Sequence, residues 1–197
     1  MAAKNTRRQI LSVAEQLLLG RGFQGFSYQH IAERLNIRNA AVHYHFPAKA
    51  DLGLALIKRH HEHFRWWAWQ LRKQKIVPAV ALERFFATER RFLEGGTVCP
   101  LGVITVELQG VSPAMRAQAH ALMDDVLAWL DAVLDSGRRT GELEFGGASH
   151  ERALLVLSAL QGALQLARLS GTEAFDRVLA LVRADLGLPA QPPGVAG

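Results

Sequence analysis

Two short helical segments joined by a tight turn, residues 27–35 and 38–46, restrict the possible folds of this chain more than any other feature. Ser27 suits the N-cap of the first segment. Asn36 stands at the turn, and asparagine is one of the few residues besides glycine that tolerate a left-handed backbone. Pro47 ends the second segment. This order predicts a helix-turn-helix.

The rest of the chain also has the apolar spacing of helices, and we find no run with the alternation of a strand. We therefore predict an all-α fold of about nine helices. The first helix is expected to begin at Thr6, where T-x-x-Q has the spacing of a capping box. The tail, residues 189–197, is rich in Pro, Gly and Ala and is expected to be flexible. Beyond the helix pair, helices are expected from Lys49 to the RKQK run and over residues 79–93, 100–111, 113–136, 149–169 and 172–186.

Charge is distributed unevenly along the 197 residues. Residues 1–75 hold thirteen Lys and Arg against four acidic residues, a net charge of +9, whereas residues 76–197 have a net charge of −4. This asymmetry indicates a head that binds a polyanion and a body with another role, the alternative being an ordinary solvated surface. No apolar run of 18 residues or signal peptide is present, and a single cysteine fits a reducing compartment, so we expect a cytoplasmic protein without a membrane segment.

The second helix of a helix-turn-helix enters the major groove of DNA with its N-terminal residues at the base edges. Arg38 and Asn39 carry donors suited to guanine or adenine, and the small side chains of Ala40 and Ala41 permit close approach. Four rings in a row, HYHF at residues 43–46, cannot all face a core, because consecutive helix positions point about 100° apart. We assign Phe46 to the core.

The stretch ILSVAEQLLLGRGFQGFSYQHIAERLNIRNAAVHYHFPAKADL resembles the N-terminal DNA-binding domain of the TetR family of bacterial transcriptional regulators. An aliphatic first helix, a GF-x-x-x-S/T turn, IA-x-x-L, a short recognition helix and HF-x-x-K occur in that order over about the first 55 residues. A GTVCPLG…E segment is similar to that of some subgroups. The resemblance implies a DNA-binding domain at residues 5–65 and a helical ligand-binding and dimerisation domain at residues 66–188.

The resemblance also implies which residues contact double-stranded DNA. Ser27 and Lys49 would bind backbone phosphates, which fix register without reading sequence. Family members commonly have tyrosine where this chain has His43, so either His43 or Tyr44 makes that phosphate contact. The DNA-contacting candidates are Ser27, Tyr28, Gln29, Arg38, Asn39, Ala40, Ala41, His43, Tyr44 and Lys49.

A regulator needs a second site coupled to the first, and the helix from Lys49 is the expected lever between them. One candidate sensor for a small-molecule effector is an aromatic-lined cavity, although ordinary core is the simpler interpretation of each ring. Its candidate residues are Trp66, Trp69, Phe86 and Trp129. Another is Cys99, an expected N-cap before Pro100 whose thiol would react with electrophiles, the alternative being a small buried apolar residue.

His60, His61 and His63 invite a metal-binding interpretation, but a third or fourth ligand at suitable spacing is missing from the pattern. No nucleophile elbow, phosphate loop or dinucleotide fingerprint occurs either. We therefore predict no metal, no cofactor and no catalytic residue. The rival hypothesis is a helical enzyme or metal-binding protein that does not bind DNA and uses this histidine face with the aromatic cavity.

The segment ALLVLSALQGALQLARL is apolar nearly all round, which for a helix indicates burial on more than one side. We predict that it and the helix that follows form a two-fold homodimer, with Leu155, Ala159, Gly162 and Leu166 at the interface, the alternative being that this face packs wholly within one chain. The predicted function is thus a homodimeric repressor, released from a palindromic operator by a small hydrophobic, aromatic or electrophilic ligand.

Overall fold

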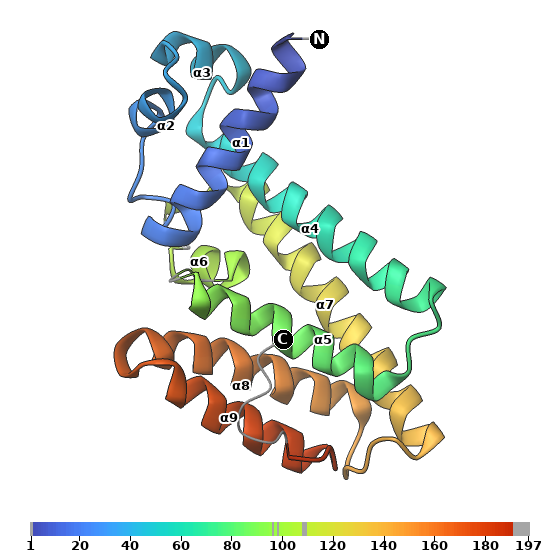
Figure 1. Cartoon of the computed structure of the whole chain (residues 1–197). Coiled ribbons are helices and arrows are strands. Elements are labelled where there is room, and N and C mark those ends of the chain that lie inside the picture. The colour runs from blue at the N-terminus through green and yellow to red at the C-terminus, as the bar shows by residue number, and fades with distance from the viewer. Residues whose placement is uncertain (1, 96, 98, 108–109, 191–197) are drawn as a thin grey trace. The chain divides into compact units, whose positions relative to one another are not determined.

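The structure is a computed structural model, and it describes residues 2–95, 97, 99–107 and 110–190. Within these residues the chain forms nine α-helices and no strand, which confirms the predicted all-α fold (Figure 1). Residues 191–197 of the predicted flexible tail lie outside the described residues. The helices are α1 (Ala2–Arg21), α2 (Tyr28–Leu35), α3 (Asn39–His45), α4 (Lys49–Lys73), α5 (Pro78–Glu94), α6 (Pro100–Val106), α7 (Pro113–Thr140), α8 (Ser149–Ser170) and α9 (Thr172–Asp185).

The chain divides into two compact units. The first unit is Met1–Arg65 with Val98–Met123, so it holds α1–α3, the first part of α4, α6 and the start of α7. The second unit is Trp66–Thr97 with Asp124–Gly197. The segment 98–123, which the sequence analysis assigned to the body, therefore belongs to the same unit as the head. Sequence order does not reveal this, because packing between distant segments decides which residues form a unit.

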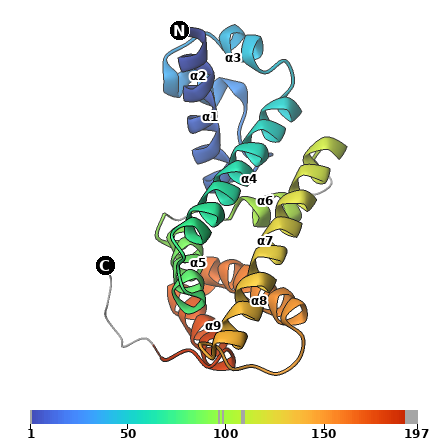
Figure 2. The same ribbon diagram turned by 90° about the vertical axis from the view of Figure 1, so that its right-hand side faces the viewer.

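The three-helix head of the first unit is built around fully buried aliphatic residues of α1. Ile10, Ala14 and Leu17 have 0–1% of their surface exposed. The helices α2 and α3 both contact α1 (Figure 2). The helix α1 begins at Ala2, so the predicted cap at Thr6 is wrong, and that residue lies inside the helix. Alanine has the highest helix propensity, which allows the helix to extend through residues 2 and 3.

The start of α4 is fixed by local signals. Pro47 precedes it, and the carboxylate of Asp51 accepts a hydrogen bond from the N–H of Ala48 at 3.0 Å, which satisfies one of the open donors at a helix N-terminus. Gly53 then lets the start of α7 approach α4 closely, since a Cβ at this position would lie 2.5 Å from Cε of Met115. This contact joins two segments of the first unit that are distant in the sequence.

The second unit is formed by α5, α8, α9 and the remaining parts of α4 and α7. The helices α8 and α9 lie side by side in Figures 1 and 2 and make the most extensive contact between any two helices. Gly171, with a φ of 84°, ends α8 and caps α9, a conformation that glycine adopts without strain. Buried Phe175 and Val182 of α9 pack in this core.

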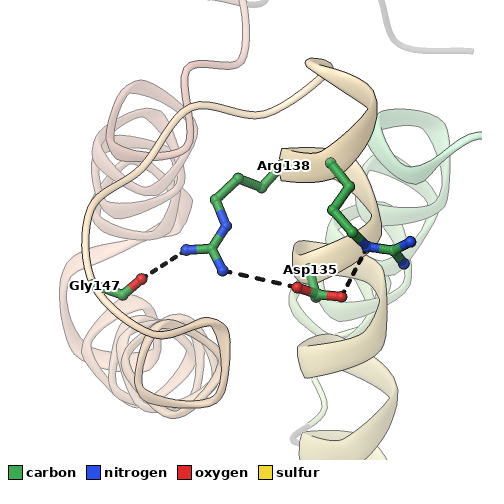
Figure 3. Close-up of polar contacts among 4 residues, drawn as sticks. Asp135, Arg138 and Gly147 are labelled. Carbon is green, nitrogen blue, oxygen red and sulfur yellow. Dashed lines mark hydrogen bonds and ion pairs between the residues drawn. The ribbon is translucent and has the colours of Figure 1, made fainter.

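Arginine side chains tie together the ends of helices in the second unit. Arg183 is buried, pairs with Glu83 and donates to the carbonyl oxygen of Pro189 at 2.9 Å. Figure 3 shows Arg138 near the end of α7. Its Nη1 donates to the carbonyl oxygen of Gly147 at 2.7 Å, and its Nη2 lies 3.7 Å from Oδ1 of Asp135. These contacts fix the connection from α7 to α8.

Candidate nucleic-acid interface

The helix-turn-helix is formed by α2, the turn at Asn36 and α3. Asn36 has the predicted left-handed conformation, with φ 50° and ψ 47°, and the next residue, Ile37, donates to the carbonyl oxygen of Ala32 at 3.0 Å. Three residues, 36–38, separate α2 from α3. Val42 of α3 is fully buried, so α3 packs on the head through one side and leaves the other exposed.

The N-terminal end of α3 carries the residues predicted to face bases. Arg38, its N-cap, is exposed, as are Asn39 and Ala40, while Ala41 is half-buried. Two donor-bearing side chains therefore stand beside two small ones on an accessible helix end. This arrangement is the one that a helix in a major groove requires.

The row of rings divides between surface and core. Phe46 is buried, as predicted, whereas Tyr44 is 79% exposed. The exposed ring of His43 packs edge-on against that of Tyr28, with ring centroids 4.6 Å apart, and half-buried His45 contacts Tyr44 in the same way at 5.2 Å. Tyr44 is thus the ring most available to a partner, and His43 is partly occupied by packing.

Tyr28 is not available as a surface contact, which corrects its place among the DNA-contacting candidates. Its side chain is only 7% exposed, and its hydroxyl donates to the carbonyl oxygen of Phe46 at 2.8 Å. Burial, with a smaller contribution from the charge of Asp51, raises the pKa of Tyr28 to about 12. The residue joins the start of α2 to the end of α3 and so holds the two helices together.

The N-terminal end of α2 presents two of the remaining candidates. Ser27 is exposed and is the N-cap of α2, as predicted, and its N–H donates to Nδ1 of His30 at 3.0 Å. Gln29 is exposed as well and donates to Oε1 of Glu33 at 3.0 Å. A helix N-terminus with open amides favours an anion such as a phosphate.

Lys49 does not extend into solvent. Its Nζ lies 4.8 Å from the ring centroids of both Phe23 and Phe26, which is cation–π distance. Burial lowers the pKa of Lys49, and the negative charge of Glu107 acts in the opposite direction. Arg7 was not among the predicted contacts. Its guanidinium lies 4.9 Å from the ring centroid of Phe46 and brings a further positive charge close to the end of α3.

The residues of the predicted aromatic sensor all lie in the second unit, but they differ in how exposed they are. Trp66 is 59% exposed, Trp69 is also exposed beneath Nζ of Lys73, and Phe86 is buried core, so these three do not line a common site. Half-buried Trp129 instead contacts Trp67 and Phe85, with ring centroids 5.0 and 5.3 Å away. Successive helix positions point in different directions, which is why neighbouring tryptophans separate in this way.

Glu89 is a buried acid that the sequence analysis did not single out. It lies one helical turn after Phe85 on α5, has 6% of its surface exposed, and accepts a hydrogen bond from Nε2 of Gln161 at 3.3 Å. Burial raises the pKa of Glu89 to about 7. Only its spacing within the apolar face LERFFATE could have indicated this burial.

The remaining sensor candidate, Cys99, and the histidine face both lie in the first unit. Cys99 is the N-cap of α6, as predicted from Pro100, and its side chain is buried. In the histidine face, Nδ1 of His61 lies 2.7 Å from Nε2 of Gln118, and burial together with the neighbouring histidines lowers the pKa of His60 to about 4. Within the described part of the chain, no group of three or more His, Cys, Asp or Glu is placed to hold a metal ion.

The helix α8 has an apolar face that the described residues leave uncovered. Leu155 and Leu166 are each 54% exposed, Gly162 is exposed, and Ala159 is half-buried. A Cβ added at Gly162 would meet nothing within 4 Å. Among the described helices only α8 is long and apolar enough to cross a membrane, a property that core helices of other proteins share, and its opposite side packs in the core of the second unit.

Comparison with known proteins gives family matches in both units. The family model described as bacterial regulatory proteins, tetR family, matches residues 10–56, and the model described as tetracyclin repressor-like, C-terminal domain, matches residues 79–182. The chain is 26% identical to the HTH-type transcriptional repressor NemR of Escherichia coli (strain K12), over 94% of this chain and 96% of that protein. It is 29% identical to the HTH-type transcriptional repressor BepR of Brucella suis biovar 1 (strain 1330), over 97% and 96%.

Solved structures share the fold. A TetR-family transcriptional regulator from Agrobacterium tumefaciens matches with a TM-score of 0.87 and 24% identity, over 93% of this chain and 98% of that one. The reduced form of E. coli NemR matches with a TM-score of 0.76 and 24% identity, over 94% and 100%. The helix-turn-helix geometry and a C-terminal model that spans more than half of the residues together show that this chain belongs to the TetR family of bacterial regulatory proteins.

Proposed function

We propose that the chain is a homodimeric transcriptional repressor that binds a palindromic operator in the cytoplasm and is released from it by a small molecule. The main support for the proposal is the exposed N-terminal end of α3, which follows the tight turn at Asn36 in the chain. The curated relatives NemR and BepR are named as repressors, which favours repression over activation.

The exposed residues of the head suggest a division of DNA contacts. Arg38 and Asn39 are assigned to base edges, with Ala40 and Ala41 allowing the helix to approach them. The phosphate contacts are assigned to the N-terminus of α2, at Ser27 and Gln29, and to the exposed ring of Tyr44. Lys49 joins them when its ammonium leaves the rings of Phe23 and Phe26.

The uncovered face of α8 is the proposed dimer interface. Leu155, Ala159, Gly162 and Leu166 follow one another at helical intervals, and the exposed Leu169 and Leu181 add apolar surface on α8 and α9. The open backbone at Gly162 permits a second helix to approach closely. A two-fold pairing presents two heads, which suits two half-sites separated by a whole turn of DNA.

The proposed effector site lies at the cluster of Trp67, Phe85 and Trp129 in the second unit. Two of these rings are half-buried, so they offer accessible aromatic surface for a small apolar ligand. The buried carboxyl group of Glu89, one turn further along α5, supplies a polar group of the kind that orients a ligand in an apolar site.

Cys99 is proposed as a second route of release, through reaction with electrophiles. It is the only thiol in the chain and lies in the same unit as the DNA-binding head, so a change there acts close to the head. One of the similar structures, NemR, is described by its reduced form. The rival metal-binding function is not favoured, because the histidine face gathers no third ligand within the described residues.

Binding to DNA is tested by fluorescence anisotropy with a labelled duplex taken from the region upstream of the chain's own gene. Affinity should fall steeply with salt, with a slope of about −0.9 per phosphate contacted. Arg38→Ala should weaken binding roughly 10- to 100-fold, the range for loss of one bidentate base contact of about 1–3 kcal/mol. Arg84→Ala, which removes an exposed arginine of the second unit, should leave binding unchanged. Absence of salt-dependent binding by the wild type would reject the proposed function.

A further inference from the structure

We infer that Glu107, at the C-terminal end of α6, is a positioning residue that holds the loop between α1 and α2 and thereby fixes the phosphate-contacting end of the DNA-binding head. The inference rests on the proposed function, because it concerns how the DNA-contacting residues are held in place. All of the residues that carry it lie in the first unit, so each contact is internal to one compact body.

The loop and the end of α6 are joined at Gln24 by two hydrogen bonds. Its backbone N–H donates to Oε2 of Glu107 at 3.0 Å. Its side-chain Nε2 donates to the carbonyl oxygen of Gly110 at 3.2 Å. The residues that follow α6 therefore hold one loop residue by both its backbone and its side chain, and the bond to the carboxylate is of the stronger, charge-assisted kind.

Two glycines leave the space that these bonds require. A Cβ at Gly22, whose φ is +78°, would lie 2.0 Å from Oε1 of Glu107. A Cβ at Gly110 would lie 2.1 Å from Nε2 of Gln24. Any larger residue at either position would displace the partner side chain. The close contact between the loop and the end of α6 therefore depends on glycine at both positions.

The loop that Glu107 holds leads directly to the proposed phosphate contacts. Ser27, the N-cap of α2, comes three residues after Gln24. Phe23 and Phe26 flank Gln24, are both buried, and contact each other with ring centroids 6.1 Å apart. These two rings also hold the ammonium group of Lys49, on which the charge of Glu107 acts.

A movement of the end of α6 is therefore transmitted to the head through this loop. If the carboxylate withdraws from Gln24, the loop loses its anchor, and Ser27 at the N-terminus of α2 is no longer held in place. The inference gives α6 a direct route to α2, in addition to any movement carried by α4.

Electrostatics and positioning predict opposite effects of removing Glu107. Loss of a negative charge near a DNA-binding surface by itself raises affinity for DNA. Loss of the anchor lowers it, by about tenfold for a hydrogen bond to a charged group. Glu107→Ala should therefore bind the upstream duplex about tenfold more weakly than the wild type, although it carries one negative charge less.

Three matched variants complete the test. Glu107→Gln keeps an acceptor for the N–H of Gln24 and should bind at least as well as the wild type. Glu62→Ala removes an exposed acid of the same unit and should bind no more weakly than the wild type. Gln24→Ala removes only the bond to Gly110 and should weaken binding about threefold. Hydrogen exchange of the amides of residues 22–27 should be faster in Glu107→Ala and in Gln24→Ala, and unchanged in the other two.

The outcomes separate the two proposals. If the wild type does not bind the duplex, the proposed function fails. If the wild type binds and Glu107→Ala binds equally well or better, with unchanged exchange in residues 22–27, the inference about Glu107 is overturned and the proposed function stands. Circular dichroism establishes that each variant is folded at the temperature of the assay. Should Glu107→Ala not fold, Gly22→Ala decides, because its Cβ would displace the carboxylate of Glu107. Unchanged affinity and unchanged exchange of residues 23–27 in that variant overturn the inference equally.

Discussion

Removing the two exposed leucines of α8 should dissociate the proposed dimer without unfolding the protomer. Leu155 and Leu166 are each 54% exposed, so a partner covers about half of each side chain. Full burial of a leucine contributes about 1.5–3 kcal/mol, and half of that is about 1 kcal/mol. A two-fold interface contains four such side chains, which together contribute about 4 kcal/mol. The double variant Leu155→Ala, Leu166→Ala should therefore raise the dimer dissociation constant by about 10³.

Sedimentation equilibrium measures this constant directly. The wild type should be a dimer at micromolar concentration, and the double variant should be a monomer under the same conditions. Because a monomer engages only one half-site, the variant should also bind the duplex more weakly, with a loss that grows as the protein is diluted. The far-ultraviolet circular dichroism spectrum should be unchanged, because the truncated atoms are exposed in the protomer.

A matched control guards against a general effect of losing apolar surface. Val80 on α5 is 42% exposed and lies outside the apolar face of α8, so Val80→Ala should leave the dissociation constant unchanged. An unchanged dissociation constant in the double variant would show that this face of α8 is not the dimer interface. Equal weakening by Val80→Ala would show that the loss is not specific to α8.

Three further predictions concern single side chains. Burial raises the pKa of Glu89 to about 7 from an ordinary value of 4.5. Between pH 4.5 and 7 the carboxyl group is therefore protonated in the folded chain and ionised in the unfolded chain. The free energy of unfolding consequently falls as the pH rises through this window. Glu89→Gln should abolish this fall and be more stable than the wild type at pH 8, by on the order of 3 kcal/mol in urea unfolding. Tyr44→Phe should weaken binding to the duplex about fivefold, whereas His43→Phe, which keeps a ring against Tyr28, should stay within about twofold, and the reverse ranking would assign the phosphate to His43. Cys99→Ser should bind the duplex as the wild type does but resist release by N-ethylmaleimide, and unchanged release would exclude the thiol as a sensor.

Helix starts marked by proline were the most predictable boundaries because they depend on a local signal, whereas α6 ends at Val106 and not at residue 111 as expected. Pro78, Pro100 and Pro113 each occupy the first position of a helix, where a missing N–H is tolerated, and all three stand where the sequence predicted a helix to begin. Asn36 has the left-handed conformation expected from its chemistry. Thr6 misled the prediction because a capping pattern inside a helix looks the same as one at its start.

What the sequence could not reveal depends on contacts between distant segments. Tyr28 stands beside exposed Ser27 and Gln29, but it contacts the ring of His43 and the carbonyl group of Phe46, which lie fifteen and eighteen positions away. The ammonium group of Lys49 lies over two rings that precede it by more than twenty residues. A periodic pattern states which residues share a helix face, but it does not state which face the rest of the chain covers.

The shortness of α3 limits how much sequence this regulator reads by direct contact. Its seven residues span about 10 Å, which covers about three base pairs at a rise of roughly 3.4 Å, or about six in the proposed dimer. A given sequence of six base pairs occurs by chance about once in 4,000 positions. A genome with about 10⁶ competing sites therefore holds a few hundred copies of it. Most of the information that singles out one operator must therefore reside in base pairs that no side chain of α3 touches, through their stiffness and groove width.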